Sequence, residues 1–243
     1  MSDQSKESIP YAKLDYQKSD DIWLQNSITL RKLIGISGVL LPLLLWFFLW
    51  LYAGKISVLE SISHYYYTRV DGIFTITISL IAVFLIVYKG KELIDFILSF
   101  VAGISALILV LFPTSPIISE YPTTGFTYAN TILGDNPTRE TVHFVAAGIF
   151  LLILATMSIF LFTKTNKSKH EMGKQKAWRN RLYKTCGIGM ILAMAVIGLG
   201  ALNIIDADFY NNNNLTFWME VVAVELFGIS WLVKGETIFK DKA

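Results

Sequence analysis

Apolar residues gather in six long segments that are separated by more polar gaps. The segments cover residues 33–53, 72–88, 93–112, 141–162, 186–203 and 215–233. A helix that crosses a bilayer needs about 20 predominantly apolar residues, and the segments meet or approach that length. The second is the shortest, and we expect its helix to extend outward into 63–71. Because the segments lack period-two alternation and are about twice as long as a barrel strand, they predict an all-α integral membrane bundle of six transmembrane helices.

Positive charge in the gaps predicts which way this bundle faces. The gap after the fourth segment contains a single acidic residue, Glu171, against the basic residues Lys164, Lys167, Lys169, Lys174, Lys176, Arg179, Arg181 and Lys184. Successive spans cross the membrane in opposite directions, so every second gap lies on the same side, which we call the parity of the gaps. The basic residues before the first segment, after the second and after the sixth therefore lie on the same side as this gap. The other gaps are more acidic than basic. Since Lys and Arg concentrate in cytoplasmic loops, we expect both termini in the cytoplasm and three acidic loops outside.

This interpretation divides the chain into a polar cytoplasmic segment, 1–32, a six-helix transmembrane domain, 33–234, and a cytoplasmic tail, 235–243. Composition agrees, because 53% of residues are hydrophobic and only 16% are charged, whereas soluble domains carry about a quarter charged residues. We therefore expect a multi-pass protein of the cell (inner or plasma) membrane with membrane lipids as its partners. The net charge of +2 gives no strong field for nucleic acid, which we do not expect as a partner.

The gap 113–140 is the longest on the outer side and holds four of the six prolines in the chain. Loops well beyond about 15 residues are often lids or binding elements. This outer loop is therefore a candidate for covering a site at the outer face of the bundle.

Ionisable side chains near or within the apolar segments are the candidates for function, because charge is costly to bury in a membrane. His64 and Asp71 precede the second segment and are seven residues apart, so in a helix they would share a face. His143 opens the fourth segment from the outer side, and Glu220 lies one to two turns into the sixth. Glu225 reaches about the mid-plane by helical rise. The candidate ligand-binding residues are Ser63, His64, Asp71, His143, Glu220 and Glu225.

Several kinds of chemistry fit this outer cluster. A carboxylate–histidine pair can bind a lipid headgroup or a cation. His64, Asp71 and His143 are also suitable zinc ligands, and bound zinc can generate hydroxide near neutral pH. A proton relay through Glu225 would suit a transporter, although no pair of Gly- or Pro-broken helices in equivalent halves accompanies it.

A serine nucleophile is a further reading of the same residues. Ser63 or Ser61 can be combined with His143 as base and Asp71 as the orienting acid. No nucleophile-elbow motif accompanies these residues, so the sequence offers little support for this arrangement.

The outer loop before the second segment carries a family resemblance. The stretch Ser61-Ile-Ser-His-Tyr-Tyr-Tyr-Thr, followed by Asp71-Gly-Ile-Phe, resembles an outer loop of the DRAM-like (damage-regulated autophagy modulator) six-span membrane proteins and their bacterial and archaeal relatives. The later stretch Leu109-Val-Leu-Phe-Pro-Thr and His143 look like the bacterial members. The resemblance covers roughly 33–234. It implies a six-span membrane protein with both termini inside, but no settled activity and no catalytic residues.

A second resemblance is to membrane hydrolases of the ceramidase and adiponectin-receptor type. Those proteins have seven spans, a Ser-x-x-x-His, a nearby Asp and a late His-x-x-x-His, with three histidines on zinc. Here Ser61 precedes His64 by three positions rather than four, and Ala147 stands where the second late histidine would be. A zinc site would therefore need a carboxylate such as Glu220 or Asp71 to complete it.

The sequence favours a non-catalytic membrane protein whose outer polar cluster binds a lipid or an external ligand. One alternative is a zinc-dependent membrane lipid hydrolase acting on amides or esters, with zinc as its cofactor. A second alternative is a proton-coupled transporter.

Overall fold

The computed structural model describes residues 27–90, 92–116, 133–164 and 173–237. Within these ranges the chain is helical and contains no β-strand, which confirms the predicted all-α fold. The helices are α1 (Ser27–Ala53), the 3-10 helix η3 (Ser63–Tyr67), α2 (Asp71–Val87), α3 (Leu93–Leu111), α4 (Pro137–Thr156), the π-helix η5 (Met157–Leu161), α5 (Lys174–Ala201), α6 (Ala207–Asn212) and α7 (Leu215–Lys234). The predicted segments 1–32 and 235–243 fall largely outside the described residues.

Within the described ranges, five helical stretches are long and apolar enough to cross a membrane: α1, α3, α4 with its continuation η5, α5 and α7. The remaining long helix, α2, is apolar but has 17 residues. The part of the chain that the structure describes therefore has the architecture of a helical membrane protein, with five candidate spans and one shorter apolar helix.

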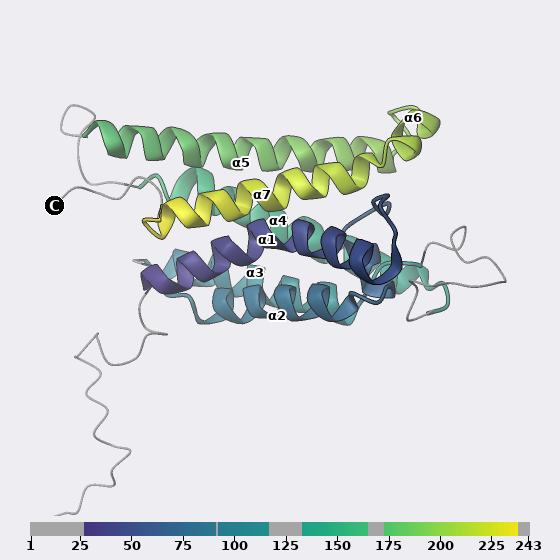
Figure 1. Ribbon diagram of the computed structural model, residues 1–243. Coiled ribbons are helices and arrows are strands. Elements are labelled where there is room, and N and C mark those ends of the chain that lie inside the picture. The colour runs from purple at the N-terminus through teal and green to yellow at the C-terminus, as the bar shows by residue number, and fades with distance from the viewer. Residues whose placement is uncertain (1–26, 91, 117–132, 165–172, 238–243) are drawn as a thin grey trace, which may run out of the picture.

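The six long helices form a closed ring. α1 contacts α2, α2 contacts α3, α3 contacts α4, α4 contacts α5, α5 contacts α7, and α7 returns to α1. Figure 1 shows these helices running side by side, with the short α6 joining α5 to α7 at one end. Long helices that follow one another along the chain are thus neighbours in space, as is usual for consecutive elements.

The outward faces of the helices are apolar as well as the inward ones. Leu43 and Leu51 of α1 and Leu192 of α5 are exposed, while Leu41 and Leu45 of α1 lie in the core. A water-soluble bundle would place polar residues on the outward face. These exposed apolar side chains instead suit contact with lipid.

Glycine permits the close approach of α1 and α7. A Cβ on Gly35 would lie 2.7 Å from the backbone nitrogen of Leu232, and a Cβ on Gly228 would lie 2.8 Å from the backbone nitrogen of Val39. Larger residues at either position would push the two backbones apart. Small residues at helix interfaces are typical of membrane bundles, where van der Waals packing drives association.

The predicted extension of the second helix into 63–71 is wrong. Ser63–Tyr67 forms a separate 3-10 helix, and α2 begins at Asp71. Thr68 has an extended backbone between them, with φ −110° and ψ 174°. Its hydroxyl donates to the Tyr65 carbonyl at 2.8 Å and accepts the Val70 amide at 3.3 Å, so a side chain–backbone turn replaces helical hydrogen bonding here.

One helix start differs from the prediction, and a short helix lies between two of the long ones. α5 begins at Lys174 rather than near 186, because its basic first turns continue the helix beyond the apolar segment. The connection between α5 and α7 contains a further short helix, α6 (Ala207–Asn212). Its N-cap is Asp206, whose side chain accepts the Phe209 amide at 2.9 Å.

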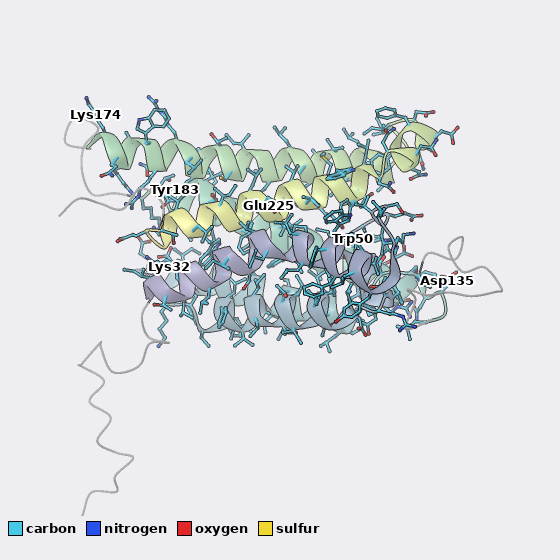
Figure 2. The ribbon with its side chains drawn as sticks, in the orientation of Figure 1. Lys32, Trp50, Asp135, Lys174, Tyr183 and Glu225 are labelled. Carbon is cyan, nitrogen blue, oxygen red and sulfur yellow. The ribbon has the colours of Figure 1, made fainter. Side chains whose placement is uncertain are left out.

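The two ends of the bundle differ in charge. Lys32 and Lys174 lie at one end, which we call the basic end, and Asp135 lies at the other, which we call the acidic end (Figure 2). At the basic end the Arg31 guanidinium donates to the Lys234 carbonyl at 3.4 Å and lies over the Tyr88 ring. These contacts tie α1, α2 and α7 together at the basic end.

Candidate functional site

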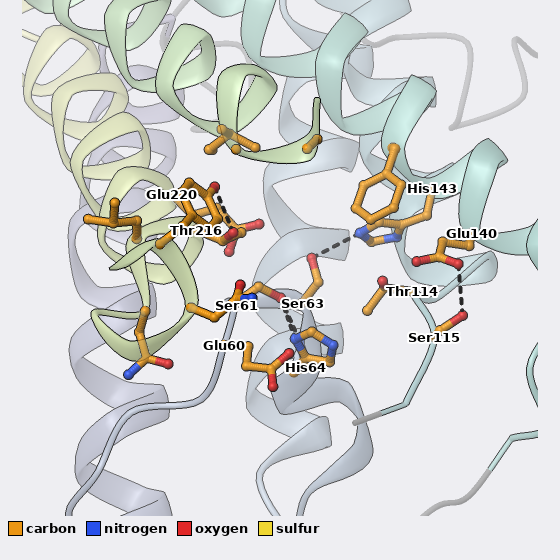
Figure 3. Close-up of a pocket in the computed structure, with 18 of the residues that line it drawn as sticks. Glu60, Ser61, Ser63, His64, Thr114, Ser115, Glu140, His143, Thr216 and Glu220 are labelled. Atoms are coloured by element: carbon orange, nitrogen blue, oxygen red, sulfur yellow. Dashed lines mark hydrogen bonds between the residues drawn. The ribbon is translucent and has the colours of Figure 1, made fainter. Parts of the chain in front are cut away.

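A polar pocket of about 440 Å³ opens at the acidic end of the bundle. It lies among η3, the start of α4, the end of α5 and the start of α7 (Figure 3). Its ionisable lining residues are Glu60, His64, Glu140, His143 and Glu220, and serine, threonine, tyrosine and asparagine side chains complete most of the polar wall. Among the described lining residues there is no Lys or Arg. Pockets with a few convergent polar groups are the usual form of a small-molecule site.

His143 is fixed in this wall from two sides. It lies in the second turn of α4, which begins with Pro137 after the cap Asn136, whose side chain accepts the Arg139 amide at 3.0 Å. The imidazole is only 2% exposed. Its Nδ1 lies 2.9 Å from the Phe112 carbonyl oxygen, and its Nε2 lies 3.0 Å from the Ser63 hydroxyl.

These two contacts determine the tautomer of His143. A carbonyl oxygen only accepts hydrogen bonds, so Nδ1 must carry the hydrogen that faces Phe112. In the neutral imidazole Nε2 is then the acceptor, and the Ser63 hydroxyl donates to it. The link joins residues that are 80 positions apart in the sequence, and Figure 3 shows it crossing from η3 to α4.

Three further contacts hold η3 in place. The Ile62 amide donates to Glu220 Oε2 at 2.5 Å, which joins the start of η3 to α7. The Tyr67 hydroxyl donates to the Thr114 carbonyl, which joins its end to the segment after α3. Within the turn, the Ser61 hydroxyl lies 2.8 Å from His64 Nδ1. The short helix is thus anchored to several elements of the bundle.

The segment after α3 forms another wall of the pocket, with Thr114, Ser115 and Pro116 in the lining. Arg139 Nε donates to the Pro113 carbonyl at 3.1 Å, and its Nη2 donates to the Gly134 carbonyl at 2.9 Å. The Ser115 hydroxyl donates to Glu140 at 3.1 Å. These bonds hold the described flanks of the predicted 113–140 lid against α4, whereas residues 117–132 of that loop lie outside the described residues.

The structure brings together four of the six candidate residues. Ser63, His64, His143 and Glu220 all line the pocket. Asp71 is instead the first residue of α2, where its Oδ1 accepts the Gly72 amide at 2.8 Å, and it does not line the pocket. The proposed shared face of His64 and Asp71 is lost because the turn at Thr68 separates η3 from α2.

Glu225 is also apart from the pocket. It lies near the middle of α7 (Figure 2) and is not one of the pocket-lining residues. The structure therefore does not place in this pocket the carboxyl group that the transporter hypothesis uses.

The hypothesis of a zinc site receives no support from the arrangement of side chains. Within the described ranges, no group of three or more His, Cys, Asp or Glu residues is placed so that it could hold a metal ion. His64, Asp71 and His143 consequently do not form the ligand set proposed from the sequence. Both ring nitrogens of His143 already have hydrogen-bond partners, and Asp71 lies on another element.

Several lining residues have no signal in the sequence that identifies them. Glu60, Thr114, Ser115, Glu140 and Thr216 face the pocket from four different elements or connections. The only general signal is the parity of the gaps, which places all of these positions on the same side of the bundle. Which of them meet depends on the helix packing.

No protein-family model, curated protein or solved structure matches this chain. The DRAM-like resemblance stays a prediction.

Proposed function

We propose that the chain is a six-span protein of the cell membrane, with both termini in the cytoplasm, and that its pocket binds a lipid headgroup or a small external ligand. The observation that carries this proposal is a polar pocket of about 440 Å³ at the acidic end of an apolar bundle. Polar side chains that converge at one end of a membrane bundle are costly unless they serve a site or a wet cavity.

The apolar outward face of α2 supports a sixth span. Ile76, Leu80, Val83 and Val87 are exposed and follow the spacing of one helix face. At 1.5 Å per residue, the 17 residues of α2 extend about 26 Å, which is slightly less than the ~30 Å hydrocarbon core. Local thinning of the bilayer accommodates such a mismatch at modest cost. With α2 included, the chain crosses six times and its termini share a side.

The charge difference between the ends supports the orientation, because basic residues favour the cytoplasmic side. Asp135 and Lys174 are both exposed, at opposite ends of the bundle. The native Cys186 is buried, so it should contribute little background to thiol labelling. In intact cells, we expect a membrane-impermeant maleimide to label the Asp135→Cys variant and to label Lys174→Cys only after permeabilisation. The reverse pattern would show that the bundle faces the other way.

The lining indicates the type of ligand. Three carboxyl groups, two imidazoles and several hydroxyl and amide groups face the pocket, and no described lining residue is Lys or Arg. An anionic group such as a free phosphate would find no cation there to balance it. A hydrogen-bonding group that is neutral or positively charged, such as the amine of an ethanolamine headgroup, fits this wall better.

Binding is testable with a variant that fills the pocket. Ala201, the last residue of α5, lines the pocket, whereas Leu199 is an exposed apolar residue two positions earlier that does not. We expect phosphatidylethanolamine or soluble ethanolamine to raise the thermal unfolding temperature of the purified protein more than phosphatidylglycerol does. Ala201→Trp should abolish this stabilisation and Leu199→Trp should retain it. An equal response to all three compounds, or a full response in Ala201→Trp, would contradict the proposal.

A further inference from the structure

We propose that Ser63 and His143 form a nucleophile–base pair that hydrolyses carboxylic esters held in the pocket. This inference rests on the proposed function in one respect, since the same pocket must present the ester. The central observation is the 3.0 Å contact between the Ser63 hydroxyl oxygen and His143 Nε2. Hydrogen-bond contact between a hydroxyl and a neutral imidazole is the geometry by which a histidine activates a serine.

The histidine is oriented as a general base requires. Its Nδ1 hydrogen is held by the Phe112 carbonyl at 2.9 Å, which leaves Nε2 unprotonated toward Ser63. In a serine triad an acid occupies the position that Phe112 takes here. The sequence assigned that position to Asp71, but Asp71 lies at the start of α2, outside the pocket lining. A neutral carbonyl fixes the tautomer without stabilising the imidazolium as a carboxylate would, so we expect a slow pair.

The two side chains also differ in solvent exposure, as expected for a nucleophile and its base. Ser63 is partly exposed and lines the pocket, whereas His143 is buried behind it. A substrate in the pocket can therefore reach the hydroxyl oxygen while bulk water has limited access to the imidazole. Figure 3 shows the Ser63 side chain reaching from η3 toward the His143 ring.

A second serine–histidine pair in the same pocket serves as an internal comparison. The Ser61 hydroxyl lies 2.8 Å from His64 Nδ1, and it also accepts the backbone amide of His64 at 3.3 Å. The two residues are three positions apart, and this double contact is typical of a hydroxyl that closes a local turn. Ser63 and His143 come from different elements and have no such local role.

The reaction balances with water as the only co-reactant. The Ser63 oxygen attacks the ester carbonyl carbon, a new C–O bond forms, and the hydroxyl proton passes to His143 Nε2. As the bond from that carbon to the leaving oxygen breaks, His143 returns the proton to that oxygen and the alcohol departs. Water then attacks the acyl-serine, gives one proton to His143 and releases the carboxylic acid. His143 finally reprotonates the Ser63 oxygen, so both residues are regenerated.

The lining restricts the substrate class to esters whose neighbouring headgroup is neutral or positively charged. Such an ester can come from a membrane lipid or from a soluble compound. Fatty-acid release from phosphatidylethanolamine vesicles tests the first source, and hydrolysis of soluble acetylcholine tests the second. Hydrolysis in either arm supports the class. If neither compound is hydrolysed although Ser63 reacts with a fluorophosphonate probe, the ester assignment is refuted.

Reaction of the full-length protein with a fluorophosphonate probe tests the pair itself. In this reaction the serine oxygen forms a bond to phosphorus, fluoride leaves, and the histidine takes the proton. We expect peptide mapping to place the adduct on Ser63 rather than on Ser61. Labelling should be absent in Ser63→Ala and about 100-fold slower in His143→Gln, since a positioned general base contributes about that factor.

The His143→Gln variant separates a base from a structural clamp. A glutamine amide can still hydrogen-bond to a carbonyl or a hydroxyl, but it cannot take up the proton. If the contact only holds η3 to α4, His143→Gln should change the unfolding temperature without changing the rate of labelling. Labelling of the unmodified protein should also slow at acidic pH, where the imidazole is protonated.

The failure of this inference is distinguishable from failure of the binding proposal. If Ser63 of the unmodified protein is not labelled above the level of Ser63→Ala, the nucleophile–base pair is refuted. Stabilisation by ethanolamine compounds, and its loss in Ala201→Trp, would still stand in that case. If stabilisation fails but Ser63 is labelled, the pair stands and the ligand assignment is wrong.

Discussion

The Leu80→Lys variant is expected to lose most of its properly inserted protein, whereas Val87→Lys is expected to retain it. Leu80 and Val87 lie on the same outward face of α2, seven residues apart, and are 45% and 48% exposed. They differ in depth, because Leu80 is near the centre of α2 and Val87 is its last residue. A lysine at the centre of a transmembrane helix costs about 2.5–3.5 kcal/mol. Near the helix end the same side chain can extend to the interface at much lower cost.

The matched pair decides whether α2 spans the membrane. The amount of each variant that resists alkaline extraction of the membrane fraction, and its thermal unfolding in detergent, are the measurements. If α2 lay outside the hydrocarbon core, both lysines would be on a solvent-facing surface and both variants would behave like the unmodified protein. Five spans would then place the two termini on opposite sides, so this result would also overturn the proposed orientation.

Hydropathy predicts where the apolar part of each long helix lies, but it does not always predict where the helix begins. The predicted segments 93–112 and 215–233 nearly coincide with α3 and α7, because there the apolar run and the helix end together. α5 instead begins at Lys174, where basic residues continue the helix without adding hydrophobicity. Hydropathy reports which residues prefer lipid, whereas helical hydrogen bonding can continue into residues that do not.

For the candidate site, too, the sequence predicts the general position of the residues but not their contacts. The parity of the gaps correctly places Ser63, His143 and Glu220 at one end of the bundle. It does not predict their partners, since His143 and Glu220 bond to the backbone of Phe112 and Ile62. Every residue carries the same backbone groups, so such pairings leave no signature in the sequence.

The loss of Asp71 from the predicted cluster has a local cause. The prediction required a continuous helix from 63 to 71 for His64 and Asp71 to share a face. The Thr68 hydroxyl forms a turn with its neighbours and ends that continuity. Such competition between a threonine side chain and the helix is hard to foresee, because threonine is also common within helices.

The Glu220→Leu variant is expected to be destabilised by about 2 kcal/mol, since a buried donor left unsatisfied costs about 1–3 kcal/mol. Glu220 Oε2 accepts the Ile62 amide at 2.5 Å, and Ile62 is only 5% exposed. Leucine has no side-chain oxygen, so the Ile62 amide loses this acceptor. Ser63 directly follows Ile62, so release of this anchor should also weaken the contact with His143. We therefore expect lower unfolding temperature, weaker stabilisation by ethanolamine and slower labelling of Ser63.

Two controls separate the hydrogen bond from other roles of the carboxyl group. Glu220→Gln keeps a side-chain oxygen that can accept the Ile62 amide, so it should retain most of the stability that Glu220→Leu loses. Glu225→Leu makes the same change five residues later in α7, at a position that does not line the pocket. Because it removes an ionisable group from the membrane without removing a pocket contact, it should not destabilise the protein. Equal unfolding temperatures for Glu220→Leu and Glu225→Leu would show that Glu220 does not anchor η3, because loss of the bond to Ile62 should destabilise only the first variant.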